Sequence, residues 1–183
     1  MRKESEVRDR LRQSFRWWGD RTDPDFRADV TGWWRNPGTL LLLGPSLAQL
    51  FADSAPTVVM GTESRGSLLG VLTAQYVGVG FAEVRKNPGR AANSDAWWET
   101  STGPDYRNRS LRLGLLRPLL QAGDRVLFVD DWIATGAQAE ACYSLVEMSG
   151  ASWIGAAVVV DGLERTSLRW KLRVKLMLNV REL

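Results

Sequence analysis

The sequence contains no histidine and only one cysteine among its 183 residues. Without histidine there is no Ser-His or Cys-His nucleophilic pair, no histidine zinc ligand and no histidine general base. The single cysteine, Cys142, permits no disulfide within the chain, and its position in a predicted helix indicates a small core residue. A reduced, buried thiol fits the cytoplasm, which is the location we expect.

Long apolar runs and basic runs are also missing. The most apolar stretch, residues 39–51, is too short and too interrupted to span a bilayer, and the charge-dense residues 1–16 do not resemble an export signal. A net charge of +3 favours anionic small molecules, but no basic run is interleaved with aromatic residues as in a nucleic-acid groove. We therefore expect a protein that binds neither membranes nor nucleic acids.

Apolar periodicity predicts strands that alternate with helices along the chain. Strands are expected at 57–60, 80–84, 125–129, 153–160 and 174–180, and helices at 4–18, 40–51, 67–76 and 139–148. This alternation is typical of the α/β class, in which helices flank a mostly parallel central sheet. Neither a repeat nor a linker divides the chain, so residues 1–183 are expected to form a single domain.

The clearest chemical signal lies in residues 125–138, RVLFVDDWIATGAQ. An apolar run that reads as a strand buried on both faces ends in Asp130 and Asp131, and a turn of small residues then opens a helix. The turn therefore lies outside the carboxyl end of a strand, where open α/β sheets bind their ligands.

The order of groups in this turn suits a ribose that carries a phosphate. Asp130 and Asp131 offer acceptors to two neighbouring hydroxyls, while backbone N–H groups at the helix N-terminus can surround a phosphate. Thr135 and Gln138 add side-chain donors. A loop for nucleoside triphosphates would need a lysine in the turn, and none is present. The alternative without a ligand is an acidic strand end followed by a helix cap at Thr135.

The same segment resembles the phosphoribosyl-diphosphate (PRPP) signature of type I phosphoribosyltransferases, in which four apolar residues precede D-D-x-x-A-T-G-G-T. Ala137 and Gln138 depart from the signature, because the family favours Gly and then Thr or Ser there. The resemblance implies that Asp130 and Asp131 hold the ribose. It implies a loop for the 5′-phosphate made of Ala134, Thr135, Gly136, Ala137 and Gln138.

Two further segments resemble the adenine phosphoribosyltransferase branch of this family. Residues 58–70, VVMGTESRGSLLG, resemble its strand followed by G-x-[DE]-S-R-G, and residues 79–86, VGFAEVRK, resemble its next strand ending in Arg-Lys. In the family the bond equivalent to Glu63-Ser64 is a cis peptide.

These two segments are expected to bind pyrophosphate. The N–H groups around Ser64 and the guanidinium of Arg65 suit it, because a guanidinium matches phosphate oxygens bidentately. Arg85 and Lys86 look like cations for the same pyrophosphate, although Arg85 fits a solvated surface charge equally well.

The N-terminal residues 1–50 are expected to form helices and a small hood over the base. Residues 28–37 resemble in spacing the family segment that opens this hood. Phe26 is the candidate to stack on the purine if one residue, such as Ala28, is an insertion, and Arg27 takes the aromatic position otherwise. Asp105, followed by Tyr106, matches the family's lid carboxylate near the purine, where the family has Glu.

Residues 87–110 are long, polar and rich in Gly, Pro, Ser and Asn, which predicts irregular structure. Loops of this length are either disordered or functional lids, and the family has here a flexible loop that closes over its substrates and excludes water. Trp97 and Trp98 either shield the site or hold an apolar contact. Trp132 is expected to pack in the core rather than stack on a ligand.

The residues and the resemblance together predict a Mg²⁺-dependent transferase with Asp130, Asp131 and Asp105 as its catalytic carboxylates. It would move the 5-phosphoribosyl group from PRPP to a nitrogenous base, most readily adenine, and give AMP and pyrophosphate. Mg²⁺ is expected to bind mainly through the diphosphate, with no dedicated protein metal site. The family and the tryptophan pairs also suggest a homodimer. The alternatives are another purine or an unusual acceptor, and a non-catalytic PRPP-sensing regulator.

Overall fold

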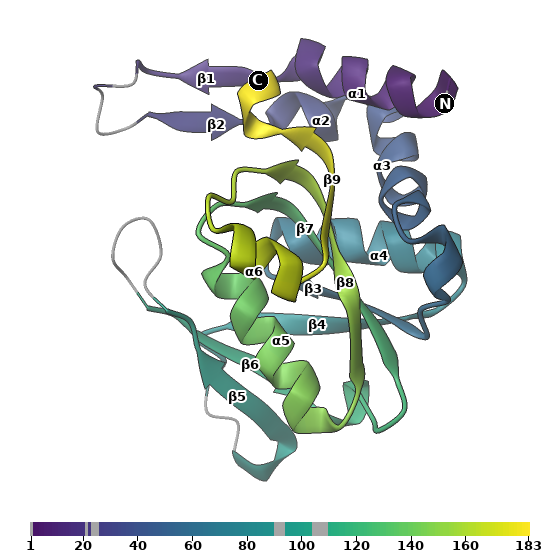
Figure 1. Cartoon of the computed structure of the whole chain (residues 1–183), viewed down its shortest axis with the longest axis vertical. Helices are drawn as coiled ribbons and strands as arrows, with labels where there is room; N and C mark the ends of the chain where they lie inside the picture. The colour runs from purple at the N-terminus through teal and green to yellow at the C-terminus, as the bar shows by residue number, and fades with distance from the viewer. Residues whose placement is uncertain (1, 21, 23–25, 90–93, 104–109) are drawn as a thin grey trace.

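A seven-stranded sheet with the strand order β5-β6-β4-β3-β7-β8-β9 forms the centre of the protein (Figure 1). The computed structural model describes residues 2–20, 22, 26–89, 94–103 and 110–183. The strands are β3 (Val58–Thr62), β4 (Gly80–Lys86), β5 (Trp97–Ser101), β6 (Arg112–Leu116), β7 (Arg125–Ile133), β8 (Ser152–Asp161) and β9 (Val174–Asn179). Strands β4, β3, β7, β8 and β9 are parallel, and β6 and β5 extend the sheet antiparallel beside β4. The predicted α/β class with a mostly parallel sheet is confirmed.

Helices cover both faces of this sheet (Figure 1). They are α1 (Arg2–Ser14), α2 (Thr31–Arg35), α3 (Pro37–Gln49), α4 (Arg65–Val77), α5 (Ala137–Ser149) and α6 (Thr166–Lys171). Alternate residues of β7 divide the core: Val126 and Phe128 join the cluster that packs on α5, and Leu127 and Val129 join the cluster on α3 and α4. Cys142 is fully buried in the α5 cluster, as predicted.

The N-terminal segment differs from the predicted helix over residues 4–18. Helix α1 ends at Ser14, and strand β1 (Arg16–Trp18) pairs antiparallel with strand β2 (Arg27–Asp29). The apolar residues at helical spacing pack into the core only as far as Phe15, which is buried directly after the end of α1. Beyond it, adjacent tryptophans are placed on opposite faces of a hairpin, where each finds a different aromatic or polar partner.

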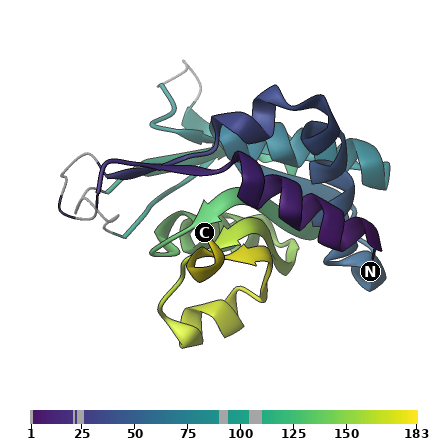
Figure 2. The same ribbon diagram turned by 90° about the horizontal axis from the view of Figure 1, so that it is seen from above.

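The hairpin β1–β2 extends from α1 as a narrow arm (Figure 2). In Figure 1 it lies on the same side of the molecule as β5 and β6. The base of the arm is held by the C-terminal turn, because the carboxylate of Glu182 forms ion pairs with both Arg8, at 2.8 Å, and Arg12. The last residues of the chain thus fix the first helix and the arm that follows it.

The region 87–110 also differs from the predicted irregular structure. Its centre forms strand β5, which pairs with β6, a strand that the sequence did not reveal. Trp98 packs against the core, and the guanidinium carbon of Arg117 lies 4.1 Å from the centre of its ring. Packing of Trp98 against the core therefore stabilises a strand here, although the residues around it favour turns. Residues 90–93 and 104–109, which include Asp105, lie outside the described residues.

Candidate active site

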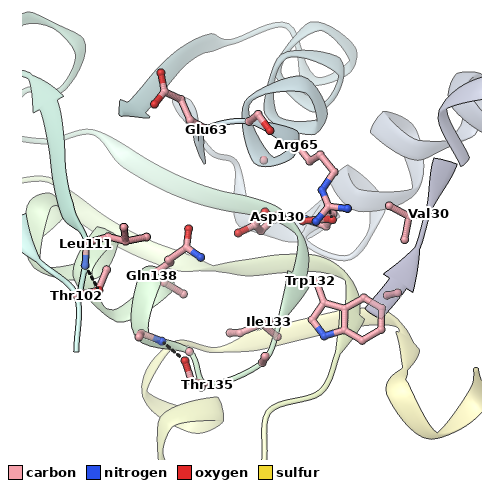
Figure 3. A pocket seen from close by; sticks show the side chains of 18 of the residues that line it. Val30, Glu63, Arg65, Thr102, Leu111, Asp130, Trp132, Ile133, Thr135 and Gln138 are labelled. Atoms are coloured by element: carbon pink, nitrogen blue, oxygen red, sulfur yellow. Dashed lines mark hydrogen bonds and ion pairs between the residues drawn. The ribbon is translucent and has the colours of Figure 1, made fainter. Parts of the chain in front are cut away.

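A cavity of about 650 Å³ lies at the carboxyl ends of β3, β4 and β7 (Figure 3). Its wall combines the loop after β3, the loop after β7, the hairpin β1–β2 and the two ends of the loop between β5 and β6. The predicted residues that line it are Phe26, Arg27, Ser64, Arg65, Lys86, Asp130, Asp131, Ala134, Thr135, Gly136, Ala137 and Gln138. Segments far apart in the sequence are thus brought to one site.

Asp130 and Asp131 belong to strand β7 itself and not to the loop after it. Pairing with β3 stops at Val129, but pairing with β8 continues to Ile133, so β7 extends past its neighbour. The two carboxylates are therefore held on a rigid strand, and alternation directs them to different surroundings.

Asp131 is buried and lies beside a cation. Its Oδ2 atom is 2.9 Å from Nε of Arg65, the first residue of α4. The side chain of Asp131 is 8% exposed, whereas that of Arg65 is 47% exposed, so the guanidinium reaches from the surface of the cavity to the carboxylate.

Asp130 is held by neutral donors instead. Its Oδ1 atom accepts the backbone N–H of Asp131 at 2.9 Å, and its Oδ2 atom accepts the hydroxyl of Thr62 at 3.5 Å. Burial, followed by the neighbouring charge of Asp131, raises the pKa of Asp130 well above its usual value, and Lys86 opposes this shift. The pair therefore contains one carboxylate stabilised by an arginine and one that ionises reluctantly.

The loop after β3 is fixed by its glutamate. The Glu63-Ser64 peptide bond is cis, as the resemblance implied. The Glu63 backbone N–H donates to the carbonyl of Val84 at 3.0 Å, and the Glu63 carboxylate accepts the backbone N–H of Lys86 at 2.8 Å. These two bonds tie the loop to β4 and bring Ser64, Arg65 and Lys86 to the same cavity.

Arg85 does not line the cavity of this chain, and its assignment to pyrophosphate stays a prediction. Its Nε atom is 3.1 Å from the carboxylate of Glu83, and its guanidinium carbon lies 6.0 Å from the centre of the Trp97 ring. Arg85 and Lys86 are adjacent on β4 and so point to opposite faces of the sheet. Of these two cations, only Lys86 lines the cavity described here.

The loop after β7 lines the cavity and leads into helix α5. Gly136, the N-cap of α5, has a φ of 80°, which favours glycine, and a Cβ atom there would lie 2.6 Å from Cδ2 of Leu168. Ala137 is the first helical residue, so the alanine that departs from the family pattern needs no special backbone conformation. Its N–H donates to the hydroxyl of Thr135 at 3.3 Å, and the amide of Gln138 points toward Asp130 (Figure 3).

Aromatic rings close the other end of the cavity. Phe26 is stacked on Trp17, with ring centres 4.7 Å apart and an interplanar angle of 13°, and Trp17 meets Trp132 edge-on at 6.0 Å. Trp132 packs against the core, as predicted, but also lines the cavity. Arg27 lines the cavity too, and its guanidinium carbon lies 5.6 Å from the centre of the Trp18 ring.

Several lining residues were missed in the sequence, among them Trp17, Thr102 and Leu111. Trp17 could have been found by reading residues 16–18 and 27–29 as a hairpin with Trp17 and Phe26 on one face. Thr102 and Leu111 join the two ends of the predicted lid, because the Thr102 N–H donates to the Leu111 carbonyl at 2.8 Å and the Leu111 N–H donates to the Thr102 hydroxyl at 2.9 Å. Trp97 and Trp98 are not part of the lining, which leaves them the role of apolar contact.

Comparison with known proteins agrees with this arrangement of groups. Residues 36–179 match the model of the phosphoribosyl transferase domain. The chain therefore belongs to the phosphoribosyltransferase family. An adenine phosphoribosyltransferase of Methylococcus capsulatus is 38% identical over 133 residues, which cover 73% of this chain and 75% of the relative.

Solved structures of adenine phosphoribosyltransferases share the fold. The enzyme from Rhodothermus marinus is 30% identical, with a TM-score of 0.78 over 96% of this chain and 99% of its own. The enzyme from Saccharomyces cerevisiae is 27% identical, with a TM-score of 0.77 over 94% of this chain and 97% of its own. That structure is a complex with D-2,5-dideoxy-2,5-imino-altritol 1,6-bisphosphate and adenine. No helix among the described residues of this phosphoribosyltransferase has the length and apolar character to cross a membrane.

We predict that Asp130→Asn raises the melting temperature of this phosphoribosyltransferase by a few degrees at neutral pH. The folded protein binds the Asp130 proton more tightly than the unfolded chain does, since burial raises its pKa above 3.8. Ionisation of Asp130 therefore costs stability as the pH rises above 3.8. The amide oxygen of the substituted side chain can still accept the Asp131 N–H, so this hydrogen bond remains.

Thermal unfolding between pH 4 and pH 8 checks this prediction. The difference between variant and wild type should grow with pH from a small value at the acidic end. Asp53→Asn, at an exposed position in the 3₁₀ turn Ala52–Ser54, is the matched control and should show no such growth. A melting temperature of Asp130→Asn below that of the wild type at every pH would contradict the account of Asp130.

Proposed function

We propose that this protein transfers the 5-phosphoribosyl group from PRPP to adenine and so forms AMP and pyrophosphate. One observation carries the proposal: a single cavity is lined by the loop 134–138 at the start of α5, by the carboxylate pair with Arg65 and Lys86, and by the stacked rings of Phe26 and Trp17. These three parts match the phosphate, the ribose and the base of the product. The adenine phosphoribosyltransferases among its relatives support adenine as the acceptor.

In this proposal the carboxylate pair holds the ribose while the reaction proceeds at its C1 atom. The C1–O bond to pyrophosphate breaks, a bond forms between C1 and a ring nitrogen of adenine, and that nitrogen loses its proton. Asp130 and Asp131 accept hydrogen bonds from the two ribose hydroxyls. Arg65 and Lys86 offset the charge of the departing pyrophosphate, and the Ser64 hydroxyl donates a hydrogen bond to it.

Mg²⁺ would add to this neutralisation of the diphosphate. No group of three or more His, Cys, Asp or Glu side chains suited to a metal ion occurs within the described ranges of the chain. The nearby donors are the carboxylates of Asp130 and Asp131, and the second of these already pairs with Arg65. Such a donor set fits an ion that arrives with the diphosphate and keeps several waters. Asp105, as the acid near the purine, stays a prediction, as does a cytoplasmic location.

Pyrophosphate release from Mg-PRPP with a panel of bases tests the proposed function. We expect steady-state turnover with adenine and the appearance of AMP in equal amount. Turnover only with another base would refute adenine as the acceptor but leave the phosphoribosyl transfer reaction intact. PRPP binding without turnover on any base would favour a PRPP-sensing regulator and contradict the proposal.

A double substitution tests the ribose assignment. Asp130→Asn together with Asp131→Asn should weaken PRPP binding and cut turnover by orders of magnitude, because both carboxylate acceptors are lost from one strand. Titration calorimetry with Mg-PRPP measures the affinity, and circular dichroism checks the fold. Asp124→Asn, in the turn before β7, is a control that should keep wild-type affinity. Unchanged affinity in the double variant would refute the assignment.

A substitution at the aromatic end tests the base assignment. Phe26→Ala should raise the apparent KM for adenine far more than that for PRPP, by about 5- to 150-fold, because stacking on one aromatic ring is worth about 1–3 kcal/mol. Trp18→Ala is the matched control, since Trp18 belongs to the same hairpin but does not line the cavity. Equal effects on the two KM values would place the base elsewhere.

We also propose that the protein is a homodimer. Helices α3 and α4 expose the apolar side chains Leu41, Leu68, Val71 and Tyr76, which are 50–75% accessible. Light scattering at micromolar concentration should give twice the 20.5 kDa of one chain, and Leu68→Glu should lower this mass. A wild type that stays at the mass of one chain would exclude the dimer.

A further inference from the structure

We propose that Asp161 and Arg169, outside the cavity, are positioning residues for the phosphate loop 134–138. The segment between them carries two leucines that fill the space behind Gly136, and the ion pair fixes that segment. The inference rests on the proposed function, because that function assigns the 5′-phosphate to this loop.

The aspartate of this ion pair is buried and has complete hydrogen bonding, whereas the side chain of Arg169 is 31% exposed. Asp161, the last residue of β8, is 1% exposed, and its Oδ2 atom accepts Nε of Arg169 at 2.7 Å. Its Oδ1 atom accepts Nη2 of Arg169 at 3.3 Å and the backbone N–H of Leu163 at 2.8 Å. Nη2 of Arg169 also donates to the Leu163 carbonyl. Four hydrogen bonds thus close the turn between β8 and α6.

This turn is also joined to the strand that carries the carboxylate pair. The Gly162 N–H donates to the carbonyl of Ile133 at 2.8 Å, and Ile133 is the last residue of β7 before the phosphate loop. This hydrogen bond therefore joins the start of the turn after β8 to the start of the loop after β7.

Two leucines of this segment contact the phosphate loop where its backbone is most unusual. Leu163 and Leu168 are each 3% exposed. A Cβ atom on Gly136 would lie 2.6 Å from Cδ2 of Leu168 and 3.1 Å from Cδ1 of Leu163, so the leucines already occupy that space. Gly136 holds a φ of 80° against this apolar surface, and the N–H groups that follow it are those assigned to phosphate.

An ion pair whose carboxylate is fully buried is poorly explained by stability alone. Desolvation offsets much of the attraction between buried charges, and apolar side chains of similar volume often give an equal or more stable fold. A fork of hydrogen bonds between guanidinium and carboxylate fixes direction more strictly than apolar packing does. We infer that the bidentate Arg169–Asp161 pair serves to hold the two leucines in place behind Gly136.

Three variants test the inference through ligand affinity. Arg169→Gln breaks the fork, Arg169→Lys keeps the charge without the fork, and Leu168→Ala removes the contact with Gly136 while leaving the ion pair intact. Lys171→Gln is the matched control, because Lys171 also joins α6 to α5 through Glu140, at 2.9 Å, but on the surface. Calorimetric titration with ribose 5-phosphate measures the affinity of the loop for a phosphorylated ribose. Steady-state kinetics then compare the KM for PRPP with the KM for adenine.

We expect Arg169→Gln and Leu168→Ala to weaken ribose 5-phosphate binding and raise the KM for PRPP by about ten-fold or more, since small displacements at a site have large effects. The KM for adenine at saturating PRPP should stay near that of the wild type, Arg169→Lys should be intermediate, and Lys171→Gln should be unaffected. A purely structural role would instead lower the melting temperature and leave the ratio of the two KM values unchanged.

Normal ribose 5-phosphate affinity in folded Arg169→Gln and Leu168→Ala would overturn the inference. Leu168→Ala decides alone if Arg169→Gln does not fold, because Arg169→Gln leaves the buried carboxylate of Asp161 without its cation, with the Leu163 N–H as a remaining donor. A wild type that binds ribose 5-phosphate but releases no pyrophosphate with any base would refute the proposed function only, and the variants would still decide the positioning role. A wild type that does not bind ribose 5-phosphate would overturn both.

Discussion

The extension of β7 beyond its pairing with β3 is the constraint on which the cavity depends. If β7 ended beside β3, at Val129, the two carboxylates would lie in a loop. Pairing with β8 as far as Ile133 instead holds them on a strand, with Arg65 of α4 beside Asp131 and Gln138 of α5 directed toward Asp130. Because the binding groups are already ordered on a rigid strand, less conformational entropy is lost when a ligand binds.

The same placement sets the electrostatics of the site. Arg65 stabilises the charge of Asp131, whereas burial and the charge of Asp131 make Asp130 difficult to ionise. A ligand that brings hydroxyls to both carboxylates adds donors to the two that Asp130 already has, and a diphosphate offers Arg65 a second anion. Arg65 and Lys86 line the cavity together with this pair, while the hairpin contributes the stacked rings of Trp17 and Phe26 together with Arg27. Charged and aromatic groups thus line a single cavity.

The sequence predicted the parts of the fold and site that rest on local patterns. The β-branched and apolar runs of the central strands are buried on both faces, and the two Asp residues with the small-residue turn mark the phosphate loop without reference to tertiary contacts. Long-range pairing was not readable: β1 and β5 are short and aromatic, and their partners lie across polar segments. The place of Trp17 in the cavity lining was missed for the same reason, since its face depends on strand alternation in the hairpin β1–β2. No sequence pattern marked the Asp161–Arg169 pair, because these residues do not line the cavity and act on the phosphate loop only through Leu163 and Leu168.

Simultaneous binding of ribose 5-phosphate and adenine tests the central claim that one cavity holds both halves of a nucleotide. The affinity for ribose 5-phosphate is measured by calorimetry with and without saturating adenine. The account predicts that both bind at once, with undiminished affinity for ribose 5-phosphate, and that Phe26→Ala weakens only the adenine step. Competition between the two ligands for a single position would contradict it.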